Sequence, residues 1–221
     1  MSSRSPDPSA GRDVSERENQ PGRAGAKSAR TRQRLVSSAA ELFAARSFDA
    51  VSVRAIAKAA GVDPALINHY FGSKEGLFQA VMEASLRPER VEAEVLSSSR
   101  EEWGHSIVRA VERAWTSPAA YGLSAIVRRA IAGNQNLISA FVSRAFLPRL
   151  AQLLDCPEPE RSLRAGLAGA QIAGLVLARH VVRVDPLASL TSDQIVGLIG
   201  PVVQHYLTGA IGAEGLCGDD I

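Results

Sequence analysis

Apolar side chains recur every three or four positions over most of the chain, from about residue 28 to residue 209. This spacing places them on one side of an α-helix, and we find no segment with the strict alternation of a half-buried β-strand. Glycine, proline and asparagine break the pattern at intervals and mark the expected helix ends. The pattern predicts an all-α protein with helices at about 28–46, 53–60 and 64–71, a fourth that starts after Gly72-Ser73 and continues into 89–98, and further helices at 102–116, 119–133, 135–154, 158–183 and 192–209.

The most informative stretch is the pair of short helices between Val53 and Phe71. Gly61 separates them, and glycine most readily takes the left-handed conformation that ends a helix. Asp63 and Pro64 then restart a helix, because a carboxylate can cap the first N–H groups and proline fits the first turn. An ordinary αα-hairpin would also accept glycine at its turn. The residues between the two helices favour a DNA-binding helix-turn-helix instead. Ala57 is small where the helices cross, and Ile56, Val62 and Ile67 fill the space between them.

The surrounding sequences, TRQRLVSSAAELFAARSFDAVSVRAIAKAAGV and NHYFGSKEGLFQAVMEA, resemble the N-terminal domain of the TetR family of one-component transcriptional regulators. The resemblance extends from about Ser28 to Leu86. It implies a three-helix helix-turn-helix domain followed by a helical domain that binds a small-molecule effector and dimerises. Residues 1–26 are rich in Ser, Pro, Gly and Arg, a composition typical of disorder. The expected organisation is a disordered tail at 1–26, a DNA-binding domain at 27–87, an effector-binding and dimerisation domain at 88–210 and a flexible C-terminus at 211–221.

Positive charge is concentrated on the segment that holds the helix-turn-helix. The formal net charge of the chain is only +2, but residues 27–76 carry eight Lys and Arg against four Asp and Glu. Contact with the DNA backbone requires such a distribution. Four cations lie at the start of the first helix, where the helix dipole disfavours positive charge: Lys27, Arg30, Arg32 and Arg34. The cluster suggests an external anion such as phosphate, although any single one of them can equally serve only to keep the helix end soluble.

The expected DNA contacts divide between bases and backbone. Asn68 and His69 can read base edges or bind phosphate, and Pro64 and Ala65 are suited to methyl contacts with thymine. By the resemblance, Arg54 can reach a base edge, and Tyr70 and Lys74 bind the backbone. The full expected set is Ser52, Arg54, Pro64, Ala65, Asn68, His69, Tyr70 and Lys74.

The last two long helices are expected to form a dimer interface. Each glycine inside a helix costs about 1 kcal/mol relative to alanine, so the glycines at 166, 169 and 174 suggest close approach of another helix. Internal packing within one chain would also account for them. Two chains would present two recognition helices to a palindromic operator. The expected interface residues are Gly166, Ala170, Ala173, Gly174, Leu177, Ile195, Ile199, Val202 and Tyr206.

The family resemblance places an effector pocket among the middle helices. The large or polar residues there are the candidates for its walls, although such residues more often belong to the core or the surface: Trp103, Trp115, Tyr121, Arg128, Phe141 and Phe146. These residues predict a mostly apolar pocket and a hydrophobic or aromatic effector.

The sequence offers no pattern for catalysis or for a cofactor. Its four histidines and two cysteines show no metal-ligand spacing, and we find neither a nucleophile elbow nor a phosphate loop. The residues near Met1 lack the apolar run of a signal peptide, and residues 166–182 are interrupted by Gln, Arg and His, so a cytoplasmic, nucleoid-associated protein is expected.

The resulting interpretation is a homodimeric repressor that binds a palindromic operator and is released by a small molecule. Two alternatives remain. One is a DNA-binding regulator of the same fold whose body is filled and binds no ligand. The other is an all-α small-molecule-binding protein or enzyme that does not act on DNA.

Overall fold

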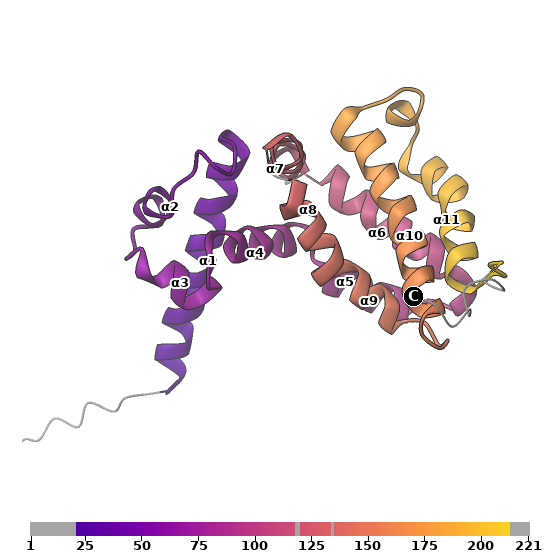
Figure 1. Ribbon diagram of the computed structural model, residues 1–221, viewed down its shortest axis with the longest axis horizontal. Coiled ribbons are helices and arrows are strands. Elements are labelled where there is room, and N and C mark those ends of the chain that lie inside the picture. The colour runs from indigo at the N-terminus through magenta and orange to yellow at the C-terminus, as the bar shows by residue number, and fades with distance from the viewer. Residues whose placement is uncertain (1–20, 118–119, 134, 213–221) are drawn as a thin grey trace, which may run out of the picture.

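The computed structural model describes residues 21–117, 120–133 and 135–212, and all its regular elements are helices over these ranges. They form a smaller N-terminal head, α1 to α3, and a larger helical body, with α4 running between them (Figure 1). The terminal segments expected to be disordered fall mostly on 1–20 and 213–221, outside the described residues. The α-helices are α1 (Pro21–Ala45), α2 (Val53–Ala60), α3 (Ala65–Phe71), α4 (Lys74–Leu86), α5 (Pro88–Leu96), α6 (Trp103–Thr116), α7 (Ala120–Gly133), α8 (Gln135–Phe141), α9 (Leu147–Gln152), α10 (Glu160–Val176) and α11 (Ser192–Thr208).

The head is packed around three phenylalanines that the sequence places on different elements. The rings of Phe43 on α1, Phe48 after it and Phe78 on α4 lie with their centroids 5.5 to 5.7 Å apart. All three side chains are buried. Aromatic rings at this separation attract one another beyond the burial of their surface. The head and the start of α4 are thereby fixed together.

The first helix begins at Pro21, earlier than the predicted start at Ser28, so 21–26 are helical and not part of a tail. The fourth helix also differs from the prediction. It ends at Leu86, because Arg87 takes a left-handed conformation with φ of 47°, and α5 starts directly at Pro88. The expected continuation of this helix into 89–98 is therefore wrong. The chain turns at this point from the head into the body.

The body is built on a close crossing of α6 and α11. A Cβ atom on Gly104 would collide with the backbone at Gly200, and one on Gly200 would collide with the His105 ring. Gln204 fixes the crossing, since it accepts a hydrogen bond from the Gly104 N–H at 2.7 Å and donates one to the Arg100 carbonyl at 2.9 Å. A capping box of Thr191 and Gln194 starts α11. In Figure 1, α10 lies next to this pair of helices.

Two predicted helices contain wider, π-helical turns. The helix predicted at 135–154 is continuous in α8 and α9, with such a turn at Val142–Phe146 between them. The helix predicted at 158–183 runs through α10 into a second π-helical segment, η3 (Leu177–Val182). Turns of this kind are frequent at functional sites.

By length and composition alone, Glu160–Val182 could cross a membrane, with a mean hydropathy of 1.4. It also contains Arg179, which is buried and paired with Glu112 inside the body. We interpret it as a core helix of the body. Only 39% of its most apolar window is buried within the subunit, so much apolar surface remains uncovered.

Candidate DNA-binding face and effector cavity

The turn between α2 and α3 has the geometry that its residues predict. The Ser52 hydroxyl accepts the Ala55 N–H at 3.1 Å and caps α2, and Gly61 has φ of 62° at its other end. Asp63 Oδ1 accepts the Ala65 N–H at 2.7 Å, which confirms its role as a cap for α3. The end of α2 and the start of α3 are therefore both defined by these local bonds and by the left-handed Gly61.

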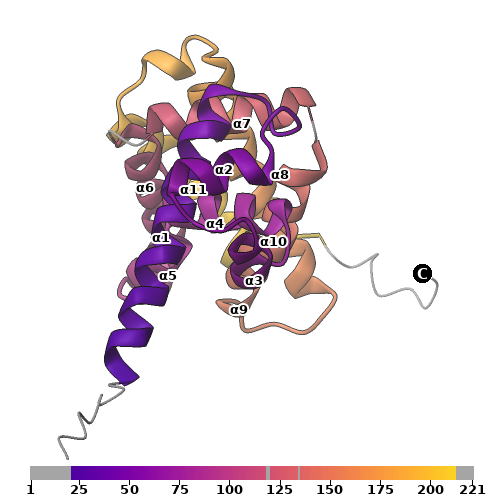
Figure 2. The ribbon, with the colours of Figure 1, turned by 90° about the vertical axis from the view of Figure 1, so that its left-hand side faces the viewer.

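The outer face of α3 is free of contacts with the body. Pro64, Ala65, Asn68 and His69 are exposed, whereas Ile67 is completely buried beneath them. In Figure 2 the head faces the viewer, with α2 and α3 in front of the body. Arg54 on α2 is also exposed, so the structure brings together most of the predicted contact residues at the end of the molecule away from the body.

Two predicted backbone contacts already have partners within the chain. The hydroxyl of Tyr70 accepts a hydrogen bond from Ser28 at 3.1 Å, which leaves its own proton available to a phosphate. The Lys74 ammonium donates to the carbonyls of Phe48 and Val51 at 2.9 and 3.0 Å and lies 4.1 Å from the centre of the Phe48 ring. Lys74 therefore ties α4 to the loop before α2, a structural role that the sequence did not indicate.

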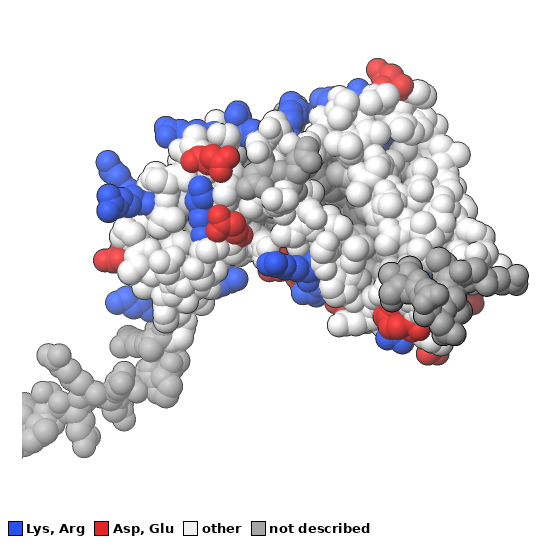
Figure 3. Space-filling model, in the orientation of Figure 1, with Lys and Arg blue, Asp and Glu red and all other residues white. Residues whose placement is uncertain are grey.

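The cations at the start of α1 also divide into two kinds. Lys27 and Arg30 are exposed, and their charged groups have no bonded partner among the described residues. Arg34 instead donates to the carbonyls of Ala60 and Gly61, where a cation satisfies the end of α2. The Arg32 guanidinium lies 5.2 Å from the centre of the Phe71 ring. In Figure 3, Lys and Arg side chains gather at the outer end of the head.

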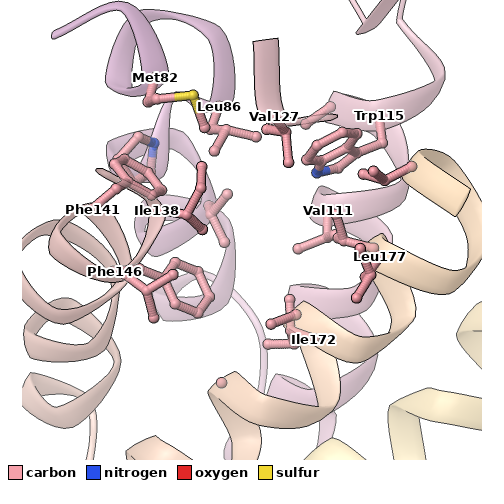
Figure 4. Close-up of a pocket in the computed structure, with 18 of the residues that line it drawn as sticks. Met82, Leu86, Val111, Trp115, Val127, Ile138, Phe141, Phe146, Ile172 and Leu177 are labelled. Carbon is pink, nitrogen blue, oxygen red and sulfur yellow. The ribbon is translucent and has the colours of Figure 1, made fainter. Parts of the chain in front are cut away.

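An apolar cavity of about 240 Å³ opens among the helices of the body and α4 (Figure 4). Of the predicted wall residues, Trp115, Phe141 and Phe146 line it, and in Figure 4 Phe141 and Phe146 face Trp115 across the space. No charged residue lines it within the described part of the chain. The wall consists of Met82, Leu86, Pro88, Val91, Val111, Ala114, Trp115, Val127, Ile131, Ile138, Phe141, Val142, Phe146, Gly169, Ile172, Ala173, Val176, Leu177 and Val181.

The other three predicted wall residues lie elsewhere or cannot be placed. Trp103 lies at the end of α6 opposite to Trp115 and does not line the cavity. The Arg100 guanidinium lies 5.8 Å from the centre of its ring. Arg128 lines a neighbouring groove and donates to the Val181 carbonyl at 3.1 Å. The side chain of Tyr121 lies outside the described residues. The prediction selected large and polar residues, whereas the cavity is lined mainly by aliphatic ones, which no single-residue signal distinguishes from core.

The wall residues that sequence reasoning missed include Met82 and Leu86 on α4. They lie four positions apart and so share one face of the helix. Phe78, one turn earlier, belongs to the aromatic cluster of the head. One helix thus contacts both the base of the DNA-binding head and the cavity.

A buried charged network lies beside the cavity. The Glu112 carboxylate accepts hydrogen bonds from Arg179 at 3.1 Å, His180 at 2.9 Å and Ser192 at 2.9 Å. Burial raises the pKa of Glu112, but the bonds from His180 and Ser192 and the charges of His180 and Arg179 outweigh it and hold the pKa below 4.5. The His180 ring stacks on Trp115 with centroids 5.7 Å apart. The network therefore joins the cavity wall to the first turn of α11.

Two family profiles match the chain over its two parts. Residues 35–81 match the bacterial regulatory proteins of the tetR family, and residues 101–207 match the tetracyclin repressor-like C-terminal domain. The chain belongs to the TetR family. A TetR-family regulator from Streptomyces coelicolor A3 is 29% identical and superposes with a TM-score of 0.63, over 86% of this chain and 98% of that one.

More distant TetR-family structures share the fold alone. A regulator from Mesorhizobium loti MAFF303099 is 17% identical, with a TM-score of 0.55 over 82% of this chain and 96% of its own. The HTH-type transcriptional regulator UidR of Escherichia coli K12 is 38% identical over 52 residues, which are 24% of this chain and 26% of UidR. The chain thus matches about a quarter of the length of that curated relative.

The TetR-type C-terminal helices carry an uncovered apolar face. Ala170, Ala173 and Gly174 are exposed on α10, and a Cβ atom on Gly166 or Gly174 would meet nothing within 4 Å. Gly169 differs, because Leu147 of the same chain occupies the space above it. One predicted interface residue must be corrected: Ile195 is fully buried within the subunit and cannot contact a partner.

On α11 the outward apolar residues are Leu198 and Val202, which are 59% and 38% exposed. Leu198 was absent from the predicted interface, although it precedes Val202 by one turn. Ile199 and Tyr206 are half-buried. Leu177, the first residue of η3, is 42% exposed and also borders the cavity.

Proposed function

We propose that this TetR-family protein is a homodimeric repressor that binds a palindromic operator through α2 and α3 and is released by a small hydrophobic effector. The observation that carries the proposal is the double contact of α4. Its Phe78 side packs into the core of the head, and its Met82 and Leu86 line the cavity. A ligand that pushes these two side chains moves the helix on which the recognition unit is mounted.

The mechanism requires the ligand to prefer one arrangement of α4. A ligand changes an equilibrium only by its difference in affinity for the two states, and such coupling is typically about 1–3 kcal/mol. Two heads on one dimer must match half-sites about one helical turn apart, or a multiple of it. A small rotation of α4 in each subunit alters that separation and weakens binding without any contact between effector and DNA. The left-handed Arg87 supports a boundary between a DNA-binding domain at 27–87 and the body at 88–210.

The two alternatives predict other structures. A ligand-independent regulator of the same fold would have a filled body, and the apolar cavity of about 240 Å³ favours the ligand-responsive form. A protein that does not act on DNA would have no need of an exposed α3 face beside unpaired cations. The family is one of transcriptional regulators, and we propose that this member has no enzymatic activity and acts in the cytoplasm on nucleoid DNA.

The deciding experiment is a footprint on the DNA upstream of the protein's own gene, with purified full-length protein at several salt concentrations. We expect protection of a two-fold symmetric site that weakens steeply with salt, because phosphate contacts release counterions. Protection should also weaken when a hydrophobic effector is added. Absence of any protected site at low salt would refute a role on DNA.

Variants separate the base contacts from the backbone contacts. Asn68→Ala should reduce the preference for operator over random DNA by about 1–3 kcal/mol, the value of a good base contact. Lys27→Ala with Arg30→Ala should weaken both kinds of DNA about equally. Lys74→Ala is unsuited to this purpose, since its ammonium bonds the head together. Equal losses on operator and random DNA in both variants would contradict the assignment of Asn68.

The dimer is proposed from the uncovered face of α10 and α11. Val202→Asp puts a charge into this face, so we expect monomers at micromolar concentration in analytical ultracentrifugation. Leu96→Asp is the matched control, because Leu96 is 61% exposed and belongs to α5, not to α10 or α11. Dimers of unchanged stability in Val202→Asp would place the interface elsewhere.

A further inference from the structure

The apolar cavity borders a cationic groove on the outside of the body. Three of its wall residues, Ile131, Leu177 and Val181, also line this groove, so the two spaces share a rim. The groove's remaining walls include Arg128 on α7 and Arg183 after η3. An apolar interior therefore passes directly into a surface with two guanidinium groups.

Arg128 is held at this rim. One Nη donates to the carbonyl of Val181, itself a cavity wall residue, at 3.1 Å. A guanidinium group has five N–H donors in a planar fork, and the remaining donors of Arg128 have no other partner among the described residues. Its side chain is exposed, and no acid neutralises it within the described part of the chain.

Arg183 occupies a backbone position that glycine usually takes. Its φ of 65° is left-handed, and it ends the helical segment after α10. Residues with a Cβ atom in this region store strain, and such outliers cluster at functional sites. The Arg183 guanidinium is exposed and has no hydrogen bond or ion pair with any described residue.

A second pocket is lined by the same two arginines, together with Arg179 and His180 of the Glu112 network. Trp115 lies in both this pocket and the apolar cavity. No acidic residue is among the described residues that line the groove or the second pocket. The buried carboxylate of Glu112 is already bonded to Arg179, His180 and Ser192, and no bond joins it to either rim arginine.

We propose that the cavity takes an amphiphilic carboxylate, whose apolar part fills the space among α4, α6, α8 and α10 while its carboxylate binds Arg128 and Arg183 at the rim. Arginine suits this role because its fork matches a carboxylate in two parallel hydrogen bonds. An alkyl or arylalkyl acid smaller than a drug-sized ligand fits a cavity of about 240 Å³. The identification of this acid as the effector rests on the proposed function, whereas its binding does not.

The test measures binding of straight-chain acids to the full-length protein by calorimetry and by the fluorescence of Trp115, in a Trp103→Phe background. From butanoate to octanoate the dissociation constant should fall about fourfold for each added methylene, the value of burying one CH₂, until the cavity is full. Octanoate should bind about tenfold or more tightly than 1-octanol, since hydrogen bonds to charged groups are the stronger ones.

Substitution of the two arginines should remove this preference alone. Arg128→Ala and Arg183→Gly should each weaken octanoate binding about tenfold and leave 1-octanol binding unchanged. Arg183→Gly is compatible with the left-handed backbone, so this variant keeps the fold. Arg109→Ala is the matched control, because Arg109 is an exposed arginine on α6 that lines neither the cavity nor the groove.

Equal affinity for octanoate and 1-octanol, or equal losses for both ligands in the arginine variants, would overturn the proposal. So would an Arg109→Ala effect as large as that of Arg128→Ala. Release of DNA is measured separately on the footprinted operator. If octanoate binds as expected without releasing DNA, the effector role fails and the carboxylate site stands. If uncharged hydrophobic molecules release DNA and carboxylates bind no better, the site fails and the proposed function stands.

Discussion

The head and the body of this protein bury their apolar side chains in different ways. In the head, Phe43, Phe48 and Phe78 contact one another with ring centroids 5.5 to 5.7 Å apart and leave little space. In the body, aromatic side chains such as Phe141 and Phe146 face a cavity (Figure 4), and a charged group, Glu112, is buried nearby. The head has a closely packed aromatic core, whereas the body retains an apolar space, so we expect only the body to change its packing if a ligand fills the cavity.

The difference in packing determines how a displacement of α4 passes from the body to the head. A closely packed core transmits a displacement because it cannot absorb it. If α4 moves against the cavity, the head moves with it as a unit. A second contact joins the regions, since Arg129 on α7 donates to the carbonyl of Ala44 on α1 at 3.0 Å. Motion of α4 must therefore be accommodated at this contact as well.

The largest expected effect is the loss of a ring from the head. Phe78→Ala removes a side chain that is 1% exposed from between two other rings, so we expect a loss of about 3–5 kcal/mol in the free energy of unfolding. Phe146→Ala in the cavity wall is the counterpart. It is half-buried and already borders empty space, so its loss should be about 1–2 kcal/mol. Urea denaturation followed by circular dichroism measures both. Equal losses would mean that the two regions are packed alike.

The buried carboxylate of the body gives the next effect. Glu112→Gln leaves Arg179 buried without its counter-charge. We expect the free energy of unfolding to fall by about 3 kcal/mol, the lower end of the range for removing one partner of a buried ion pair. Glu92→Gln is the control. It removes a carboxylate whose ion pair with Arg149 is partly exposed, at 3.1 Å, and should cost less than about 1 kcal/mol.

The pH dependence of stability follows from the direction of the Glu112 shift. Its pKa in the folded protein lies below the ordinary 4.5, so near that pH the unfolded chain binds more protons. The stability that the Glu112 carboxylate contributes is present above pH 4.5, the ordinary pKa, and is lost as the pH falls through its lower pKa in the folded protein. Glu112→Gln should flatten this part of the stability profile. An unchanged acid slope in the variant would show that other carboxylates cause the acid loss.

The turn between α2 and α3 could be predicted from the sequence, whereas the start of α1 and the intramolecular bonds of Arg34 and Lys74 could not. Gly61 sets a left-handed turn and Asp63 caps a helix. Such roles depend on neighbouring backbone groups, so the residue type at that position in the sequence indicates them. No residue type at a single position in the body indicates the cavity. Met82 and Leu86 look like ordinary core residues, and only the arrangement of several helices leaves a space beside them.

The charged and apolar residues of the body show the same limit. Nothing near Glu112 in the sequence indicates that Arg179 and His180 will meet it, because the contact depends on how α6 and η3 pack. Ile195 and Leu198 both fit the apolar stripe of α11, yet one is buried and the other is 59% exposed. Periodicity identifies the apolar side of a helix, but it does not divide that side between the core and a partner surface.

The smallest expected effect concerns the two arginines in left-handed conformation, one at the junction of the regions and one at the body's groove. Arg87 and Arg183 have φ of 47° and 65°. This conformation costs a residue with a Cβ atom roughly 1–2 kcal/mol, and glycine loses about 0.5–1 kcal/mol of extra chain entropy on folding. Arg183→Gly and Arg87→Gly should therefore each stabilise the protein by about 0.5–1 kcal/mol.

Their functional consequences should differ. Arg183→Gly should lose the preference for octanoate over 1-octanol, because the groove loses one of its two guanidinium groups. Arg87→Gly should keep that preference, since Arg87 lies outside the groove, at the start of α5. Thermal unfolding and calorimetry on the same preparations measure the two quantities. If Arg183→Gly alone gains stability and loses the ligand preference, the strained backbone at Arg183 is maintained for binding. If both variants lose the preference, the preference depends on the junction between head and body instead.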